Sequence, residues 1–335
     1  MIYNNNYIIN YNMAYISQKN DSDDDIKSNS SNNSLYIEPV PFHIRGRAEW
    51  WELKRDEILL YEKIAEGGNG VINKASWRGL KCVVKCLKHN NNEVEYKDMI
   101  NEISVISHLR HPNLVLFLGA CTIITDPLLL LYEYMPNSSL DVYYSKKYCE
   151  KNRLWKPKKH LAYKWIYELT QAIYFLHHCY YPIMHRDLKP SNILLNEDLH
   201  IKLTDFGLSR TIKKKHKKYK MSGCTGTLRY MAPEILFNNG EDYDLKIDIY
   251  SLALNFWFIC CGKVPYAELD TNPHVIQLIQ LDYRPEIKEI EIIELQYLIK
   301  QMWSTNPDNR PDIDHILKMI EEIKIVEKQN KCCIC

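Results

Sequence analysis

The sequence predicts an α+β fold in which a small strand-rich lobe precedes a larger helical lobe. Between residues 58 and 135, short aliphatic and β-branched runs are separated by turns, a pattern typical of strands. After residue 140, long segments carry apolar residues at helical spacing. The chain has 335 residues, 46% of them hydrophobic, which is enough for one large domain or two moderate ones.

The strand-rich lobe is expected to hold several strands and one helix. The helix falls within residues 91–110 and ends before Pro112, and its apolar face consists of Met99, Ile103, Ile106 and Leu109. The strands are expected at residues 58–61, 71–77, 80–88, 114–124 and 128–135.

The helical lobe contains three long amphipathic patterns, at residues 161–178, 290–303 and 313–328. Residues 247–262 are apolar but include Asp248, Ser251 and Asn255, and they are too few to cross a bilayer. This segment is therefore predicted to be a buried core helix.

The composition indicates the cellular compartment of the chain and limits the partners it can bind. The formal net charge is +1, so no overall attraction to nucleic acid or anionic lipid is expected. The eleven cysteines have no zinc-site spacing and follow no secretory signal, which indicates reduced thiols in a cytoplasmic protein. Residues 1–40 are rich in Asn, Ser and Asp and are predicted to be a disordered extension.

One short loop gathers residues suited to phosphoryl transfer. The stretch "IMHRDLKPSNILL" places Asp187, Lys189 and Asn192 close together, and "LTDFG" follows with Asp205. Phosphoryl transfer needs a carboxylate to orient the attacking hydroxyl, oxygen ligands for magnesium and a lysine near the phosphates. These residues supply all three.

The ordered set of motifs resembles that of eukaryotic protein kinases. The glycine loop "IAEGGNGVINKA", "VVKCL", "HRDLKPSN", "DFG" and "MAPE" occur in the family's order across residues 50–326. The resemblance implies a bilobal protein kinase fold with ATP and Mg²⁺, or alternatively Mn²⁺, as cofactors. The implied limits are a lead-in segment at 41–57, a catalytic domain at 58–326 and a cysteine-containing tail at 327–335. Within that domain the N-lobe would cover 58–133 and the C-lobe 138–326.

The resemblance also assigns catalytic roles residue by residue. Lys85 would contact the α- and β-phosphates and pair with Glu102 in the active enzyme. Without the other motifs, both would be ordinary surface charges, and Glu93 and Glu95 lie near enough in sequence to compete with Glu102.

The loop residues receive the remaining roles. Asp187 would orient the substrate hydroxyl, and Lys189 would neutralise charge on the transferred group. Asn192 and Asp205 would hold the metal. The same resemblance implies three structural positions: Asp248 as an anchor for the catalytic loop, and Glu234 paired with Arg310.

Several residues would form the nucleotide site. In the family's glycine pattern, Ala65, Gly67 and Gly70 take the three glycine positions and Ile72 takes the valine. Alanine fits the first position if its φ is negative. Tyr132 would stand at the back of the pocket, where its size would exclude inhibitors that need a small residue. The other implied contacts are Ile64, Val83, Lys85, Glu133, Met135 and Ser139.

The loop around the catalytic aspartate indicates serine or threonine as the acceptor. Lys189 and Thr227, in "DLKPSN" and "GTLRYMAPE", match the pattern of serine/threonine kinases. "LRHPNLVLFLGACT" is similar to the tyrosine-kinase-like group, which includes Raf-like and mixed-lineage kinases. Tyrosine or dual specificity remains the alternative, and the substrates would be proteins rather than nucleic acid.

The segment between Asp205 and Glu234 suggests regulation. It carries six lysines between residues 213 and 220, a run that repels itself. One hypothesis is that phosphate on Ser222 or Thr225, added by an upstream kinase or by self-phosphorylation, orders this segment against Arg186. The alternatives are that the lysines bind an acidic partner or substrate, or that they only keep the loop soluble.

Two further alternatives concern activity and location. A pseudokinase or scaffold would share this fold, but such proteins usually lack part of the catalytic set that is intact here. The tail "KCCIC" fits a prenylation box at Cys332, which would tether the chain to a membrane. Otherwise the tail would be an unstructured end.

Overall fold

The computed structural model describes residues 41–67, 70–87, 93–123, 128–212, 228–237, 243–269 and 271–332. Phe42–Cys335 forms one compact unit. The predicted disordered extension at 1–40 lies outside the described residues. Side chains are not described at residues 93–95 and 324–332.

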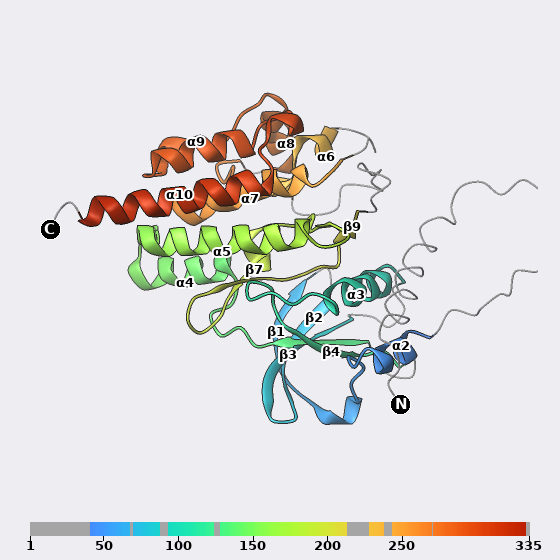
Figure 1. The fold of residues 1–335 in the computed structure, drawn as a ribbon. Coiled ribbons are helices and arrows are strands. Elements are labelled where there is room, and N and C mark those ends of the chain that lie inside the picture. The colour runs from blue at the N-terminus through green and yellow to red at the C-terminus, as the bar shows by residue number, and fades with distance from the viewer. Residues whose placement is uncertain are drawn as a thin grey trace, which may run out of the picture. The chain divides into compact units, whose positions relative to one another are not determined.

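The strand-rich lobe is a five-stranded antiparallel sheet with strand order β1-β2-β3-β5-β4 (Figure 1). Its helix, α3 (Glu93–Ile106), buries Met99, Ile103 and Ile106, as the apolar spacing predicts. The strands are β1 (Ile58–Gly67), β2 (Gly70–Trp77), β3 (Leu80–Cys86), β4 (Phe117–Cys121) and β5 (Leu129–Glu133). The five strands are thus confirmed, although β1 is longer and β4 shorter than the sequence suggested.

The lead-in segment extends this sheet at its β4 edge. A short helix, α2 (Phe42–Ala48), precedes Trp51–Leu53, whose backbone exchanges hydrogen bonds with Ala120 at 2.8 Å. Glu52 accepts hydrogen bonds from the backbone N–H and the hydroxyl of Thr122, at 2.9 and 2.5 Å. These contacts satisfy edge groups that would otherwise be exposed.

The helical lobe is built around α7 (Lys246–Cys261), whose side chains are nearly all buried, as predicted for a core helix. Around it lie α5 (Lys159–His177), α9 (Ile293–Met302) and α10 (Ile313–Cys332). The sequence did not indicate α4 (Leu140–Lys151), α6 (Pro233–Phe237) or α8 (Asn272–Gln280). Glu234 and Arg310 form the predicted ion pair, with two hydrogen bonds of 2.6 and 2.7 Å.

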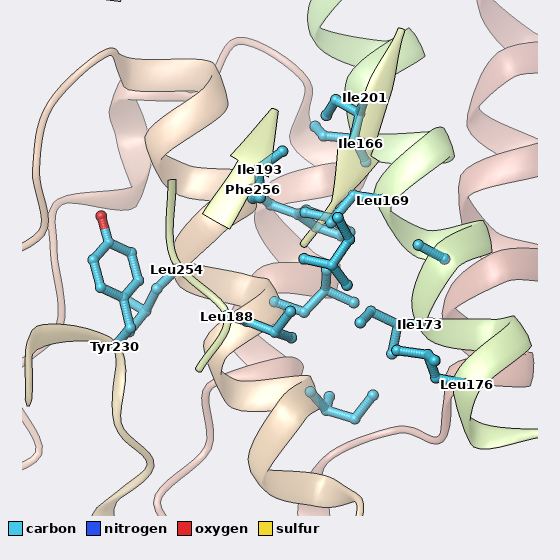
Figure 2. Close-up of a cluster of buried hydrophobic side chains, with 14 of the residues drawn as sticks. Ile166, Leu169, Ile173, Leu176, Leu188, Ile193, Ile201, Tyr230, Leu254 and Phe256 are labelled. Atoms are coloured by element: carbon cyan, nitrogen blue, oxygen red, sulfur yellow. The ribbon is translucent and has the colours of Figure 1, made fainter. Parts of the chain in front are cut away.

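Two short antiparallel strand pairs hold the loop that carries Asp187. β6 (Ile183–Met184) pairs with β9 (Arg210–Thr211), and β7 (Ile193–Leu195) pairs with β8 (Ile201–Leu203). Figure 2 shows Leu188 from the middle of this loop in a cluster with residues of α5 and α7. The loop is therefore fixed at both ends by strands and at its centre by the hydrophobic core.

The cysteines whose side chains are described agree with the expectation of reduced thiols. There are seven of them, all are free, and only Cys149 is exposed. Burial raises the pKa of Cys260 and of Cys261 to about 12, so both stay protonated and unreactive at neutral pH.

Gly119 provides a test of how the lead-in segment joins the sheet. Its φ is +151°, and an added Cβ would lie 2.6 Å from Leu53 Cγ and 2.7 Å from the Trp51 carbonyl oxygen. We expect Gly119→Ala to lower the free energy of unfolding by about 2–4 kcal/mol, from backbone strain and steric overlap.

Gly79→Ala is the matched control for this prediction. Gly79 also has a positive φ, +80°, but its added Cβ would meet nothing within 4 Å. We expect Gly79→Ala to lower the free energy of unfolding by only about 1 kcal/mol. Denaturant unfolding of both variants measures the difference, and equal losses would contradict the proposed role of close packing.

Candidate active site

Lys85 is a buried cation paired with two carboxylates. Its Nζ lies 2.6 Å from Glu102 Oε2 on α3 and 3.2 Å from Asp205 Oδ1, which follows β8. Burial acts to lower the pKa of Lys85, but the charges of Glu102 and Asp205 outweigh it and raise that pKa above its usual value. Lys85 is therefore charged, and the predicted Lys85–Glu102 pair is present.

Asp205 is held ionised in an unusual backbone conformation. Burial acts to raise its pKa, but the neighbouring charge and hydrogen bond of Lys85 bring the pKa below its usual value. Its φ is +67°, a sparsely populated region for a non-glycine residue. The following residue, Phe206, is buried and packs edge-on against the ring of His185, with 5.1 Å between ring centroids. This packing helps to fix the segment that carries Asp205 against the loop that carries His185.

The hydroxyl of Tyr132 is hydrogen-bonded to Glu102. Tyr132 Oη donates to Glu102 Oε1 at 2.5 Å, while the other carboxylate oxygen contacts Lys85. Burial and the charge of Glu102 raise the pKa of Tyr132 well above its usual value, so the phenol remains a donor. Tyr132, on β5, therefore fixes the orientation of the Glu102 carboxylate on α3.

The catalytic loop brings together the residues that the sequence placed there. Lys189 Nζ lies 2.7 Å from Asp187 Oδ2. Asn192 Nδ2 donates to both the carbonyl and the Oδ2 of Asp187, at 2.8 and 3.0 Å. Because the amide nitrogen of Asn192 is committed to Asp187, its Oδ1 is the atom left to ligate a metal.

Asp248 anchors this loop from beneath, as predicted. Its carboxylate is fully buried and accepts backbone hydrogen bonds from His185 at 2.8 Å and Arg186 at 2.9 Å. His177 Nε2 lies 3.1 Å from the same group. Burial acts to raise the pKa of Asp248, but these contacts outweigh it and lower the pKa. Arg186 has a φ of +71°, so the anchor stabilises a strained backbone.

The strand register places the expected nucleotide residues in neighbouring rows. Ala65 lies opposite Ile72, Ile72 opposite Lys85, and Val83 opposite Tyr132. Ala65 is in strand β1 and is not among the residues with positive φ, so its Cβ causes no strain. Ile64, another predicted member on β1, is exposed.

Gly70 is the position of the loop that requires glycine. Its φ is +122°, and an added Cβ would lie 2.4 Å from the carbonyl oxygen of Cys86. Gly67 pairs with it at the end of the hairpin, and residues 68 and 69 lie outside the described part of the chain. The last described pair of this hairpin is therefore formed by two residues without side chains.

The link between the lobes is tied to the helical lobe by a side chain. Glu133 Oε1 accepts from the Leu116 N–H and from Lys202 Nζ, both at 2.7 Å. Met135 is buried, and Ser139 is buried with its hydroxyl 2.5 Å from Asp141 Oδ1. All the predicted nucleotide residues from Tyr132 to Ser139 thus lie on or beside this connection.

The structure adds residues that the sequence analysis missed. Asn113 donates to the Ile201 carbonyl at 3.0 Å and so joins the α3–β4 connection to β8. Lys202 and His177 hold Glu133 and Asp248, as described above. Only Asn113 had a local signal, the "HPN" that follows the helix, because the others are defined by partners distant in sequence.

The charged groups fit a nucleotide with a divalent metal. Asn192 and Asp205 offer oxygen ligands, and Mg²⁺ in such sites commonly takes one or two protein ligands together with phosphates and waters. Lys85 would provide a fixed positive charge for the phosphates. Among the described residues no group of three or more His, Cys, Asp or Glu side chains could form an all-protein metal site.

The regulatory predictions fall partly outside the described residues. Ser222, Thr225 and Thr227 are in the undescribed stretch 213–227. Arg186, their expected counterpart, lies with its guanidinium 5.8 Å from the centre of the Tyr243 ring. Burial lowers the pKa of Arg186 and the charge of Arg210 adds to this, so an anion would be favourable beside these two arginines.

Comparison with known proteins agrees with this geometry. The family model for protein tyrosine and serine/threonine kinases matches residues 58–320. The chain therefore belongs to the protein kinase family, and its bilobal α+β fold is that of a kinase domain.

Similar proteins come from plants and amoebae. The serine/threonine-protein kinase VIK of Arabidopsis thaliana is 34% identical over 85% of this chain and 65% of its own length. A probable serine/threonine-protein kinase of Dictyostelium discoideum is 34% identical over 81% of this chain and 28% of its own length. The dual specificity protein kinase pyk3 of the same organism is 33% identical over 84% of this chain and 19% of its own length.

The match covers a kinase domain rather than whole relatives. The alignments span from 16% to 65% of the first four relatives. No helix among the described residues is long and apolar enough to cross a membrane.

The Tyr132–Glu102 hydrogen bond can be tested by removing one oxygen atom. A hydrogen bond to a charged group contributes about 1.5–3 kcal/mol. We expect Tyr132→Phe to lower kcat/KM for peptide phosphorylation by about 10- to 100-fold, because Glu102 loses a donor that orients it toward Lys85.

Tyr167→Phe serves as the control, because Tyr167 also donates to a glutamate, Glu321, at 3.3 Å but on the far helices α5 and α10. It should leave kcat/KM unchanged. Full activity in Tyr132→Phe would show that Glu102 is positioned without the phenol.

Proposed function

We propose that this chain transfers the γ-phosphoryl group of ATP to serine or threonine residues of protein substrates. The observation that carries the proposal is the convergence of Lys85, Glu102 and Asp205 from three separate elements, with Asp187 and Asn192 joined by hydrogen bonds nearby. A pseudokinase would not need to retain all of these residues.

The proposed reaction uses positioning and charge rather than covalent chemistry. Lys85, oriented by Glu102, holds the α- and β-phosphates. Asp187 orients the acceptor hydroxyl and takes up its proton. Lys189, 2.7 Å from Asp187, stabilises negative charge that develops on the transferred group.

Magnesium is the metal we propose, with manganese as a substitute. Asn192 and Asp205 would hold it, and when bound it neutralises charge on the phosphates. Ile72, Val83 and Met135 would contact the adenine, while Ser139 lies where α4 begins and would face the ribose side. The backbone around Gly67 and Gly70 would cover the phosphates.

Serine or threonine is the proposed acceptor because Lys189 is the serine/threonine-type residue and pairs directly with Asp187. Dual specificity is the second candidate, since one relative carries that name. Thr227, which would support the first choice, is not described.

The cellular location and the domain boundaries remain predictions. We propose a cytoplasmic kinase with a catalytic domain at 58–326, lobes at 58–133 and 138–326, and a tail at 327–335. Cys332 is the last residue of α10, and the side chain there is not described. Lipidation of this residue is a proposal that rests on the sequence alone.

Removing the proposed base tests the activity directly. Asp187→Asn should reduce phosphorylation of a peptide library by about 10²- to 10⁴-fold, the usual contribution of general base catalysis. Asp198→Asn, in the turn between β7 and β8, is the conservative control and should retain activity. Equal turnover by wild type and Asp187→Asn would remove the catalytic claim, and product label mainly on tyrosine would overturn the acceptor assignment.

Phosphorylation at Ser222 or Thr225 is the proposed switch, carried out by an upstream kinase or by the enzyme itself. The partly buried Arg186, held by Asp248, is the proposed counterpart. We expect the double variant Ser222→Ala, Thr225→Ala to lose about 10-fold or more of its activity, the scale of one or two charge-assisted hydrogen bonds.

The control is Ser145→Ala, an exposed position on α4 that should have no effect. Mass spectrometry of the active wild type should find phosphate at one of the two positions. Fully active enzyme with both positions unmodified would contradict the switch and would favour an acidic partner for the lysines.

A further inference from the structure

One end of the helical lobe is strongly positive, although the net charge of the whole chain is close to zero. From residue 146 to 164 there are eight lysines and arginines and one acidic residue, Glu150, whereas the full chain has 43 basic and 42 acidic residues. These residues cover the end of α4, the connection to α5 and the first turns of α5. We call them the basic face: Lys146, Lys147, Lys151, Arg153, Lys156, Lys158, Lys159 and Lys164.

Five of the eight cations of the basic face have no ion-pair partner in the described part of the chain. Lys156 lies 3.8 Å from Glu289 and Lys159 lies 3.1 Å from Glu291, and Lys147 pairs locally with Glu150 at 2.7 Å. Lys164 donates to the backbone carbonyl of Asp198 at 3.1 Å. Four exposed cations make no such contact, namely Lys146, Lys151, Arg153 and Lys158.

The basic face rests on a rigid aromatic base. Trp155, in the middle of the connection, packs edge-on against Tyr143 and Tyr144 with ring centroids 5.7 and 5.0 Å apart. Tyr144 Oη donates to the Ile259 carbonyl of α7 at 2.8 Å. Lys146, Lys151, Arg153 and Lys158 therefore lie on an ordered surface. Like charges repel one another, so grouping them there does not stabilise the fold.

Apolar side chains are exposed among these cations. Tyr148 is 53% exposed and Leu154 is 44% exposed, and both lie between basic residues in the sequence. Aromatic and aliphatic groups beside lysines suit the boundary between lipid headgroups and acyl chains. A surface that bound only by charge would not need them.

The basic face is remote from the proposed active site. Twelve helical residues separate Ser139 from Lys151, which corresponds to about 18 Å along α4. Tyr163 Oη donates to the Ile320 carbonyl, and His178 lies 3.2 Å from Asp314, so α10 runs antiparallel to α5. The last turns of α10 therefore lie at the same end as the α4–α5 connection (Figure 1). A partner bound there leaves the catalytic loop accessible.

We propose that the basic face is a docking surface for an anionic lipid bilayer. Seven of its eight cations are lysines, compact point charges suited to a diffuse layer of headgroup phosphates and carboxylates. The exposed Tyr148 and Leu154 add the apolar contact that a nucleic acid or an acidic peptide would not require. Docking needs neither kinase activity nor lipidation of the tail.

The test uses the full chain, produced without lipid modification, and sedimentation with phosphatidylcholine vesicles with and without about 30% phosphatidylserine. Binding is expected only to the anionic vesicles and should fall as salt rises above about 0.1 M, because screening weakens the attraction. Equal binding to both kinds of vesicle, or none to either, would overturn the proposal.

Variants with equal charge change locate the surface. Each removed cation should weaken binding about fivefold, so Lys146→Gln, Lys151→Gln, Arg153→Gln, Lys158→Gln together should weaken it several hundredfold, roughly. The control variant neutralises four other exposed lysines and should lose far less of its vesicle binding. These lysines are Lys54, Lys81, Lys288 and Lys300. Similar losses in both sets would show that only total charge matters and would overturn the proposal.

Two further variants separate the alternatives. Tyr148→Ser with Leu154→Ser should weaken vesicle binding about tenfold or more, from lost apolar contact; no loss, together with tighter binding to RNA or to an acidic peptide, would assign the surface to that partner instead. Lys213→Ser, Lys214→Ser, Lys215→Ser should bind vesicles nearly as wild type. Complete loss in that variant would move the membrane contact to the other lysine-rich stretch.

Discussion

The ion pairs of Lys85 are the interaction on which the proposed active site depends. A lysine in this position would be costly to bury alone, and removing one partner of a buried pair typically destabilises by about 3–5 kcal/mol. Glu102 comes from α3 and Asp205 from the segment after β8, so charge compensation requires the sheet, the helix and the helical lobe to meet at one point. The hydrogen bond from Tyr132 adds a fourth element, β5, to the same centre.

A second buried carboxylate performs a similar task in the helical lobe. Asp248 accepts hydrogen bonds from the backbone N–H groups of His185 and of the strained Arg186, and so fixes the backbone that leads into Asp187. Leu188 fills the core below it. Electrostatic anchoring and hydrophobic packing therefore act on adjacent residues of one loop, and the catalytic side chains are placed by groups that do not touch substrate.

Surface charge depends on the same tertiary arrangement. The run "KKYCEKNRLWKPKKH" is visible in the sequence, but the run alone does not say which cations are neutralised. Glu289 and Glu291, more than a hundred residues away, partly compensate Lys156 and Lys159. Within the part of the chain that the structure describes, Lys146, Lys151, Arg153 and Lys158 remain exposed without an ion-pair partner. The net charge of the chain, which argued only against an overall attraction to lipid, averages over this difference.

The sequence by itself determined the fold class, the strands and helices with strong periodicity, and the residues of the short motifs, because all of these depend on spacing within a few turns of chain. It also placed Glu234 with Arg310 and Asp248 under the catalytic loop, through the family resemblance. Only the tertiary structure decided that Tyr132 holds Glu102, that Lys202 holds Glu133, and that Gly70 tolerates no side chain. Periodicity predicts which face of a strand or helix is buried, but it does not predict which elements pack together. The partner of a buried polar group is set by that packing in three dimensions.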